Sequence, residues 1–195
     1  MLQKKLTVFL KMFAEIKGMQ QLFKHKLLLI IFESFLSNPD TFIAQLSLSC
    51  IHGFKLPHVI THFDKLKGML AKNQMREVLT KFNLSRENGD VDGEHRAELL
   101  PLVIRILFGR LSARGSGAKS SKDSPAARRA AILSFLSGLD ASEGELDYFV
   151  YMMVRSFIPK NVNMNLSETG HGSNSKIRKM ITQVQECVSI EQVAS

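Results

Sequence analysis

Apolar side chains recur along most of this chain at offsets of three and four residues, a pattern typical of helices with one buried face. In residues 2–16 these positions are Leu6, Phe9, Leu10, Phe13 and Ile16. In residues 19–36 they are Leu22, Phe23, Leu27, Ile30, Ile31 and Phe35. Gly18 separates the two stretches. The pattern therefore predicts two amphipathic helices over residues 2–36.

Prolines and capping residues mark where later helices begin. Asn38 before Pro39, and Ser124 before Pro125, each place a good N-cap next to a proline at the first helical position. Ser142 with Glu145 has the spacing of a capping box. The full set of later predicted helices is 39–53, 57–70, 74–82, 94–111, 126–139 and 142–159, with a weak terminal helix at 177–188. We therefore predict an all-α protein.

The spacing of the predicted helices suggests repeats. Candidate first helices begin near Gln20, Pro57 and Glu94, with 37 residues between successive starts. Units of about 40 residues with two helices each are typical of HEAT repeats, which stack broad apolar faces on one another. We predict a HEAT-like α-solenoid segment of antiparallel helix pairs over residues 1–159, although a plain helical bundle also fits the pattern.

Composition narrows the class of protein. Hydrophobic residues make up 45% of the chain and charged residues 23%, so it can bury a core. The two cysteines, Cys50 and Cys187, are too few for a disulfide framework and indicate a reducing compartment. The longest apolar run, residues 27–32, is far shorter than the roughly 20 residues of a membrane span. We expect neither a membrane segment nor a secretory signal.

The net charge of +8 is concentrated in two blocks. Residues 1–26 contain six lysines and one acid, and residues 110–129 contain six cations and one acid. In the second block, Arg128 and Arg129 fall in the first turn of a predicted helix, where they oppose the helix dipole. A phosphate or an acidic partner would relieve them, although solvated helix faces also explain both blocks. The candidate RNA- or partner-facing group is Arg110, Arg114, Lys119, Lys122, Arg128 and Arg129.

Residues 112–124 lack large apolar side chains, so we predict that they form a flexible basic loop. The stretch Gly115–Ser120 resembles a phosphate-binding loop, but no glycine stands directly before Lys119 and the stretch follows a predicted helix rather than a strand, so the Walker pattern fails. The chain has no tryptophan and only two tyrosines, which disfavours a platform for base stacking. Any contact with nucleic acid is therefore expected to go to its phosphate backbone.

Other candidate sites are weak. Cys50, His52, His58 and His62 cluster, and two histidines four apart can share a zinc ion. However, no glutamate directly follows His58, so we expect a histidine at a helix start and a histidine on the surface.

The acids around Asp90 and Asp92, together with Asn88, resemble half of an EF-hand, but Leu99 stands where the bidentate glutamate belongs. A solvated loop is expected there. No catalytic triad spacing is present, so we expect no enzyme activity, no metal, no cofactor and no small-molecule substrate.

Several separated motifs, in order, resemble one known family: the very large HEAT-repeat proteins of the small-subunit processome, called "down-regulated in metastasis" or processome component 20 homologue. The motifs are LQKKLTVFL at 2–10, QLFKHK at 21–26, NPDT at 38–41, QLSL at 45–48, EHR at 94–96 and LPLVIRILFGR at 100–110. The resemblance covers roughly residues 1–158. Residues 160–195 are expected to be a divergent, mostly disordered tail.

The resemblance implies a non-enzymatic α-solenoid scaffold in the nucleolus. Such a scaffold binds pre-ribosomal RNA and assembly factors alongside the U3 small nucleolar ribonucleoprotein during maturation of the small-subunit rRNA. Because family members are much longer, it also implies a fragment or a truncated form. A rival hypothesis is a protein-only HEAT adaptor that holds partner helices and does not contact RNA.

Overall fold

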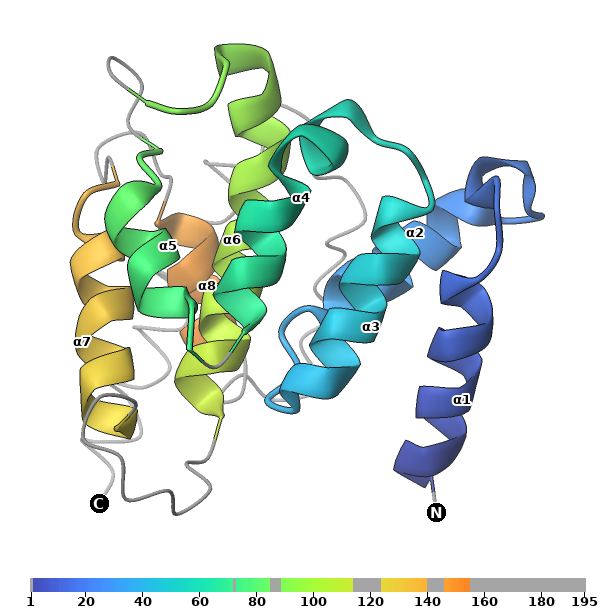
Figure 1. Ribbon diagram of the computed structural model, residues 1–195, viewed down its shortest axis with the longest axis horizontal. Coiled ribbons are helices and arrows are strands. Elements are labelled where there is room, and N and C mark those ends of the chain that lie inside the picture. Colours follow the sequence, from blue (N-terminus) through green and yellow to red (C-terminus); the bar gives the residue numbers. More distant parts are fainter. Residues whose placement is uncertain (1, 72, 85–88, 114–123, 140–145, 155–195) are drawn as a thin grey trace, which may run out of the picture. The chain divides into compact units, whose positions relative to one another are not determined.

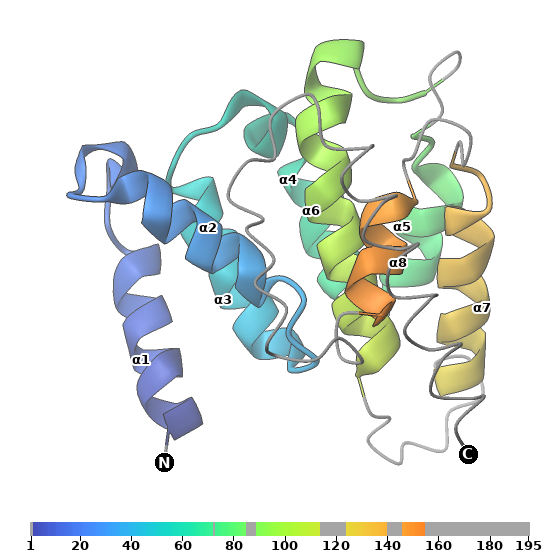
Figure 2. The ribbon, with the colours of Figure 1, turned by 180° about the vertical axis from the view of Figure 1, so that it is seen from behind.

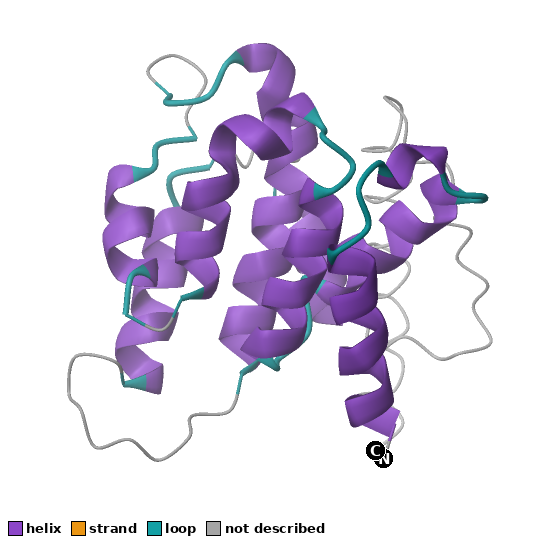
Figure 3. Cartoon of the chain, turned by 45° about the vertical axis from the view of Figure 1, so that its right-hand side comes forward, coloured by secondary structure: helices purple, strands orange, loops and turns teal. Residues whose placement is uncertain are grey.

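The computed structural model describes residues 2–71, 73–84, 89–113, 124–139 and 146–154. Throughout these residues the regular elements are helices (Figure 3), which confirms the predicted all-α class. The chain divides into two compact units, Met1–Leu139 and Asp140–Ser195. The second unit contains helix α8, Asp147–Val154. None of the described helices is both long enough and apolar enough to cross a membrane.

In the first unit most helices pack against one of two helices, α3 (Thr41–His52) and α6 (Gly93–Ser112) (Figure 1 and, from behind, Figure 2). In chain order they are α1 (Leu2–Ala14), the 3-10 helix η1 (Met19–Gln21), α2 (His25–Phe35), α3 (Thr41–His52), α4 (Pro57–Leu70), α5 (Met75–Lys81), α6 (Gly93–Ser112) and α7 (Pro125–Leu136). Helix α3 packs against α1, α2 and α4, and α6 packs against α2, α3, α4 and α7. Stacking of these helices as a solenoid stays a prediction.

Two of the predicted helix starts are confirmed. Pro57 occupies the first turn of α4. Pro125 opens α7, and the hydroxyl of Ser124 accepts a hydrogen bond from the backbone N–H of Ala127 at 3.1 Å. Both starts were predictable because the proline that opens each helix acts on its immediate neighbours, and in α7 the cap of Ser124 acts with it.

The predicted start of α3 at Asn38 and Pro39 is wrong by two residues. The N-cap is Asp40, whose carboxylate accepts a hydrogen bond from the N–H of Phe42 at 2.9 Å. Asn38 instead accepts a hydrogen bond from the N–H of Asp40 at 2.8 Å, which makes a turn ahead of the helix. Asn38 and Asp40 are both good N-cap residues, and the helix begins directly after Asp40.

The single helix predicted over residues 19–36 is divided into η1 and α2. Lys24 has a left-handed backbone with φ of 55° and stands immediately before α2. The side chain of Gln20 donates a hydrogen bond to the carbonyl oxygen of Phe54, which fixes η1 against the connection between α3 and α4. A long-range contact therefore breaks a helix that the local pattern favours.

The buried face of α2 also differs from the prediction. Phe32 and Leu36 are buried, whereas Leu27, Ile30 and Ile31 are exposed. Phe32 packs its ring edge-on against Phe13 and Phe54. Helix α2 is apolar on more than one side, and its described neighbours α3, η1 and α6 leave the side with Leu27, Ile30 and Ile31 exposed.

Helix α6 packs closely against the turn that follows α2. Its Gly109 lies so close to the turn after α2 that a Cβ there would be 2.9 Å from the backbone carbon of Ser37 and 3.0 Å from the carbonyl oxygen of Asn38. The guanidinium of Arg105 lies 3.9 Å from the carboxylate of Glu33 on α2. Burial raises the pKa of Glu33, and Arg105 opposes that effect. The last turns of α6 are therefore interior.

Candidate functional site

Arg110, a member of the predicted basic group, is only 4% exposed at the end of α6. Its Nη1 donates to the hydroxyl of Thr41 at 3.1 Å, and its Nε donates to the sulfur of Met75 at 3.5 Å. These contacts link α6 to the first turns of α3 and α5. The guanidinium therefore joins three helices, and its burial leaves little of it for a phosphate.

Arg128 and Arg129 are neighbours in the first turn of α7 but have different surroundings. Arg128 is 8% exposed, and its Nη2 donates to the carbonyl oxygen of Ala113 at 2.6 Å. A backbone carbonyl therefore compensates a cation that the helix dipole disfavours. Arg129 is exposed. Of these two arginines, Arg129 has the access that a partner would need.

The other three members of the predicted group, Arg114, Lys119 and Lys122, lie outside the described residues. The segment that carries them, residues 114–123, runs between Ala113 and Ser124. The hydrogen bond from Arg128 to Ala113 holds the first turn of α7 near the end of α6. The group as a whole stays a prediction.

The first basic block has a different character. All six of its lysines are exposed: Lys4, Lys5, Lys11, Lys17, Lys24 and Lys26. Among the described residues, none of the six is in an ion pair with a carboxylate. The ammonium of Lys11 lies 5.7 Å from the ring centre of Phe42, and that of Lys24 lies 5.3 Å from the ring centre of Phe23. The block presents uncompensated positive charge beside aromatic rings.

Large apolar side chains are exposed on α1 and α2, the helices of the first basic block. On α1 they are Val8, Phe9 and Met12, and in and just before α2 they are Phe23, Leu27, Ile30 and Ile31. The sequence pattern assigned most of these positions to the core. The signal that it missed is that α2 is apolar around more of its circumference than one neighbour can cover.

The cysteine and histidine cluster does not converge on one point. Cys50 is fully buried and donates its S–H to the carbonyl oxygen of Leu10 at 3.3 Å. Burial raises the pKa of this thiol to about 12. His52 is exposed and lies against the ring of Phe63, with ring centres 4.1 Å apart. Cys50 and His52 therefore have separate surroundings and no common ligand position.

His58 and His62 share the face of α4 that meets α6, and both are buried. The prediction of a surface histidine is therefore wrong for His62, whose ring lies 6.3 Å from that of His95. Nδ1 of His58 lies 2.5 Å from the carboxylate of Glu98. Burial lowers the pKa of both histidines. No group of three or more metal-binding side chains forms within the described part of the chain.

The loop that resembles half of an EF-hand has local roles. The carboxylate of Asp90 accepts a hydrogen bond from the N–H of Asn83 at 3.2 Å and lies 3.5 Å from the ammonium of Lys65. These contacts lower the pKa of Asp90, with the backbone hydrogen bond as the larger cause. Asp92 is exposed at the N-cap of α6, and Asn88 lies outside the described residues.

Comparison with known proteins gives a consistent result. A family model described as "U3 small nucleolar RNA-associated protein 20, N-terminal" matches residues 1–195. The chain is 28% identical to U3 small nucleolar RNA-associated protein 20 of Schizosaccharomyces pombe over 148 residues, which is 73% of this chain and 6% of the relative. It is 26% identical to the protein of that name from Saccharomyces cerevisiae over 135 residues, which is 67% of this chain and 5% of the relative. The chain thus matches only a small part of each.

Proposed function

Because this chain belongs to the family described as U3 small nucleolar RNA-associated protein 20, N-terminal, we propose that it is a helical scaffold segment of the small-subunit processome. The observation that carries the proposal is the match of the family model over residues 1–195. The proposed role is non-enzymatic. It takes place in the nucleolus, where the segment supports processing of the small-subunit rRNA next to proteins of the U3 ribonucleoprotein.

We further propose that the second basic block meets the phosphate backbone of pre-ribosomal RNA. Its direct contacts would come from Arg129 together with Arg114, Lys119 and Lys122. Arg110 and Arg128 are buried and would act indirectly, by holding the ends of α6 and α7 in place. Neutralising phosphates releases counterions, so such binding weakens steeply as salt concentration rises.

A salt titration of RNA binding tests this contact. The full chain is titrated into a labelled fragment of small-subunit pre-rRNA, with Lys119→Glu/Arg129→Glu as the test variant and Lys5→Glu/Lys67→Glu as the control of equal charge change. We expect the test variant to lower the slope of log K against log salt by about 2, because roughly one unit is lost per phosphate contact. Equal changes in both variants would show that only net charge matters.

Co-sedimentation tests the processome role itself. A tagged full chain expressed in cells is expected to move with pre-ribosomal particles on a sucrose gradient and to shift when U3 small nucleolar RNA is depleted. A chain that stays at the top of the gradient contradicts the proposal.

A protein-only adaptor is the second candidate function. The burial of Arg110 and Arg128 and the exposed apolar residues of α1 and α2 favour it. In that case co-sedimentation survives ribonuclease treatment, and the purified chain binds the pre-rRNA fragment no better than the Lys119→Glu/Arg129→Glu variant does.

A further inference from the structure

We propose that single-stranded RNA binds where η1 meets the connection between α3 and α4, with one base stacked on an exposed ring and its phosphates on lysines. This η1 corner consists of the ring of Phe23 and four exposed lysines, Lys17, Lys24, Lys26 and Lys55. It shares no residue with the second basic block. That the strand is RNA rests on the proposed function, whereas the mode of contact rests on the corner alone.

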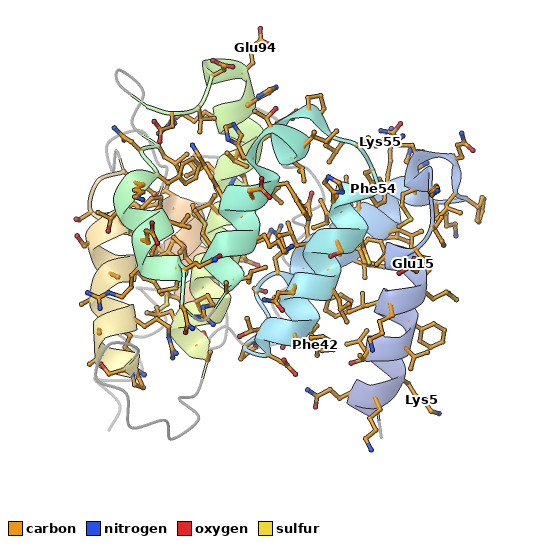
Figure 4. All side chains as sticks on the ribbon, viewed as in Figure 1. Lys5, Glu15, Phe42, Phe54, Lys55 and Glu94 are labelled. Atoms are coloured by element: carbon orange, nitrogen blue, oxygen red, sulfur yellow. The ribbon has the colours of Figure 1, made fainter. Side chains whose placement is uncertain are left out.

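One contact joins η1 to the connection between α3 and α4. The side-chain amide of Gln20 donates a hydrogen bond to the carbonyl oxygen of Phe54, and Lys55 follows Phe54 directly. Figure 4 shows Phe54 and Lys55 at the end of α3 that lies beside the loop between α1 and α2. Lys55 therefore stands at the same corner as η1.

A second contact brings Lys17 to the same place. Gly53 is so close to the chain around η1 that a Cβ there would be 2.9 Å from Cγ of Met19 and 3.6 Å from the carbonyl oxygen of Ile16. Lys17 follows Ile16 directly. Helix α2, which begins just after Lys24, also packs against η1. Three segments of the chain therefore bring their lysines to one corner.

The ring of Phe23 is accessible to a base. Phe23 is 86% exposed, more than any other large apolar residue in the described part of the chain. The ammonium of Lys24 lies 5.3 Å from the ring centre. Single strands bind where an aromatic ring stacks on a base and nearby cations meet the phosphates. Because the chain has no tryptophan, a phenylalanine supplies the ring at this corner.

The positive charge of the corner is largely uncompensated. No aspartate or glutamate occurs in residues 16–32 or 41–63, the stretches that contain the four lysines. The acid beside the corner is Glu15, which Figure 4 shows at the end of α1. Within the described residues, none of the four lysines forms an ion pair with a carboxylate. Four lysines against one glutamate leave an excess of three positive charges, which suits a polyanion.

Two of the lysines have a backbone conformation that other residues adopt more easily. Lys24 has φ of 55° and Lys55 has φ of 53°, and among the described residues they are the non-glycine positions with positive φ. Glycine takes this left-handed conformation without strain, whereas a lysine side chain has no local hydrogen bond that favours it. Strained residues of this kind gather at functional sites. Lysine at both positions therefore favours a role for its charge.

The arrangement favours RNA over a lipid surface or a protein helix. A helix that lies in a membrane interface takes its apolar and basic residues from one continuous helix. A docked protein helix covers a stripe of apolar anchors. The η1 corner instead has one aromatic ring among cations from three segments, which matches a flexible chain of phosphates that crosses several elements.

A tryptophan at the ring position reports stacking directly. Because the chain has no tryptophan, Phe23→Trp gives a single fluorescent probe at the corner. The full chain with this change is titrated with an oligouridylate of about 12 nucleotides, within the usual site sizes for single strands. We expect binding at least as tight as that of the wild type, with quenching of the tryptophan emission. The control Phe9→Trp, at an exposed position of α1, should bind without quenching.

Removal of the ring measures its contribution. Phe23→Ala is expected to weaken binding of a labelled oligouridylate about tenfold, because loss of one stacked base has an effect of this size. Phe9→Ala removes an exposed ring outside the corner and should change affinity less than about twofold. Fluorescence anisotropy gives the affinities, and circular dichroism melts check that both variants remain folded.

Glycine at the strained positions separates charge from folding. Lys24→Gly/Lys55→Gly relieves the left-handed backbone, so the melting temperature should be unchanged or higher. The slope of log K against log salt should nevertheless fall by about 1.4, because each phosphate contact of a single strand contributes about 0.7. The control Lys5→Ala/Lys67→Ala removes the same charge elsewhere and should leave the slope unchanged.

Three results would overturn the proposal: oligouridylate binding that leaves the tryptophan of Phe23→Trp unquenched, equal weakening in Phe23→Ala and Phe9→Ala, or a wild-type salt slope in the glycine variant. Quenching by phosphatidylserine vesicles or by a polyglutamate peptide, without quenching by oligouridylate, also overturns it. A chain that binds oligouridylate through Phe23 but does not co-sediment with pre-ribosomal particles contradicts the proposed function and leaves this site intact.

Discussion

The α1–α2 region and the α4–α6 region differ in how much of their apolar surface they bury, and the difference does not follow their apolar content, because α2 is the more apolar helix and yet leaves Leu27, Ile30 and Ile31 exposed. Helix α6 has neighbours on several sides and encloses even cations such as Arg96 and Arg110. Helix α1 has its main neighbour in α3 and leaves Val8 and Met12 in solvent. How much of its surface other helices cover, rather than the apolar content of a helix, decides what it buries.

Replacing an isoleucine by alanine in each region should give the largest difference in the free energy of unfolding. Ile106→Ala in α6 removes a fully buried side chain, and we expect a loss of about 2–5 kcal/mol in the free energy of unfolding. Ile30→Ala in α2 should change it by less than about 1 kcal/mol, because the side chain is already in water. Urea denaturation of both variants measures the difference, and equal losses would remove the distinction between the regions.

Buried Arg110 and exposed Lys11 should show the next largest difference in their effect on stability. Arg110→Ala removes the hydrogen bond to Thr41 and leaves a cavity between three helices, so we expect a loss of about 2 kcal/mol or more. Arg110→Met should lose less, because methionine fills part of the space. Lys11→Ala should leave the urea midpoint unchanged. A stable Arg110→Ala chain would indicate that this arginine is available for binding.

Two glycines of α6 should respond differently to replacement by alanine. Gly109→Ala would place a methyl group against backbone atoms of Ser37 and Asn38, and we expect a loss of about 1–3 kcal/mol. Gly93→Ala meets nothing within 4 Å and should be neutral or stabilising by up to about 1 kcal/mol. Thermal melts should therefore show a lower melting temperature for Gly109→Ala and an equal or higher one for Gly93→Ala, and a stabilising Gly109→Ala would contradict the close approach of α6.

The smallest expected effect is a loss of stability at acidic pH that comes from the buried histidines of α4. Burial lowers the pKa of His58, so below the unfolded value of about 6.5 the unfolded chain binds more protons and stability falls as pH falls. Glu98 opposes this shift, and His95 adds to it.

We expect His58→Gln to lessen the decline in unfolding free energy between pH 7.5 and 5, with His62 maintaining part of it. His52→Gln, on the exposed side of α3, should follow the wild-type decline. Denaturation curves at several pH values provide the measurement. An unchanged slope in His58→Gln would show that this histidine gains a proton in the folded chain as readily as in the unfolded one.

The helices were largely predictable because their signals are local. Pro57 and the pair Ser124–Pro125 act on the turns they open. The break between η1 and α2 was not predictable, because it is fixed by Gln20 reaching the carbonyl of Phe54, 34 residues away. Local rules place helices, and contacts of this range decide where they are interrupted.

The candidate site was less predictable for the same reason. Charge counting found Arg110 and Arg128, but the burial of Arg110 depends on Thr41, 69 residues earlier in the chain. The exposure of Ile30 depends on which side of α2 meets α3, and a helix that is apolar on several sides does not specify this. A sequence shows which residues carry charge or apolar surface, and only packing shows which of them reach solvent.

Cys50 lies between α1 and α3, so its reactivity can report how often the two helices separate. Its thiol is enclosed, bonded to the backbone of Leu10, and kept protonated by a pKa of about 12. Because only an exposed thiolate reacts quickly, alkylation of Cys50 in a Cys187→Ser chain requires α1 to detach first. The alkylation rate then reports how often α1 separates from α3.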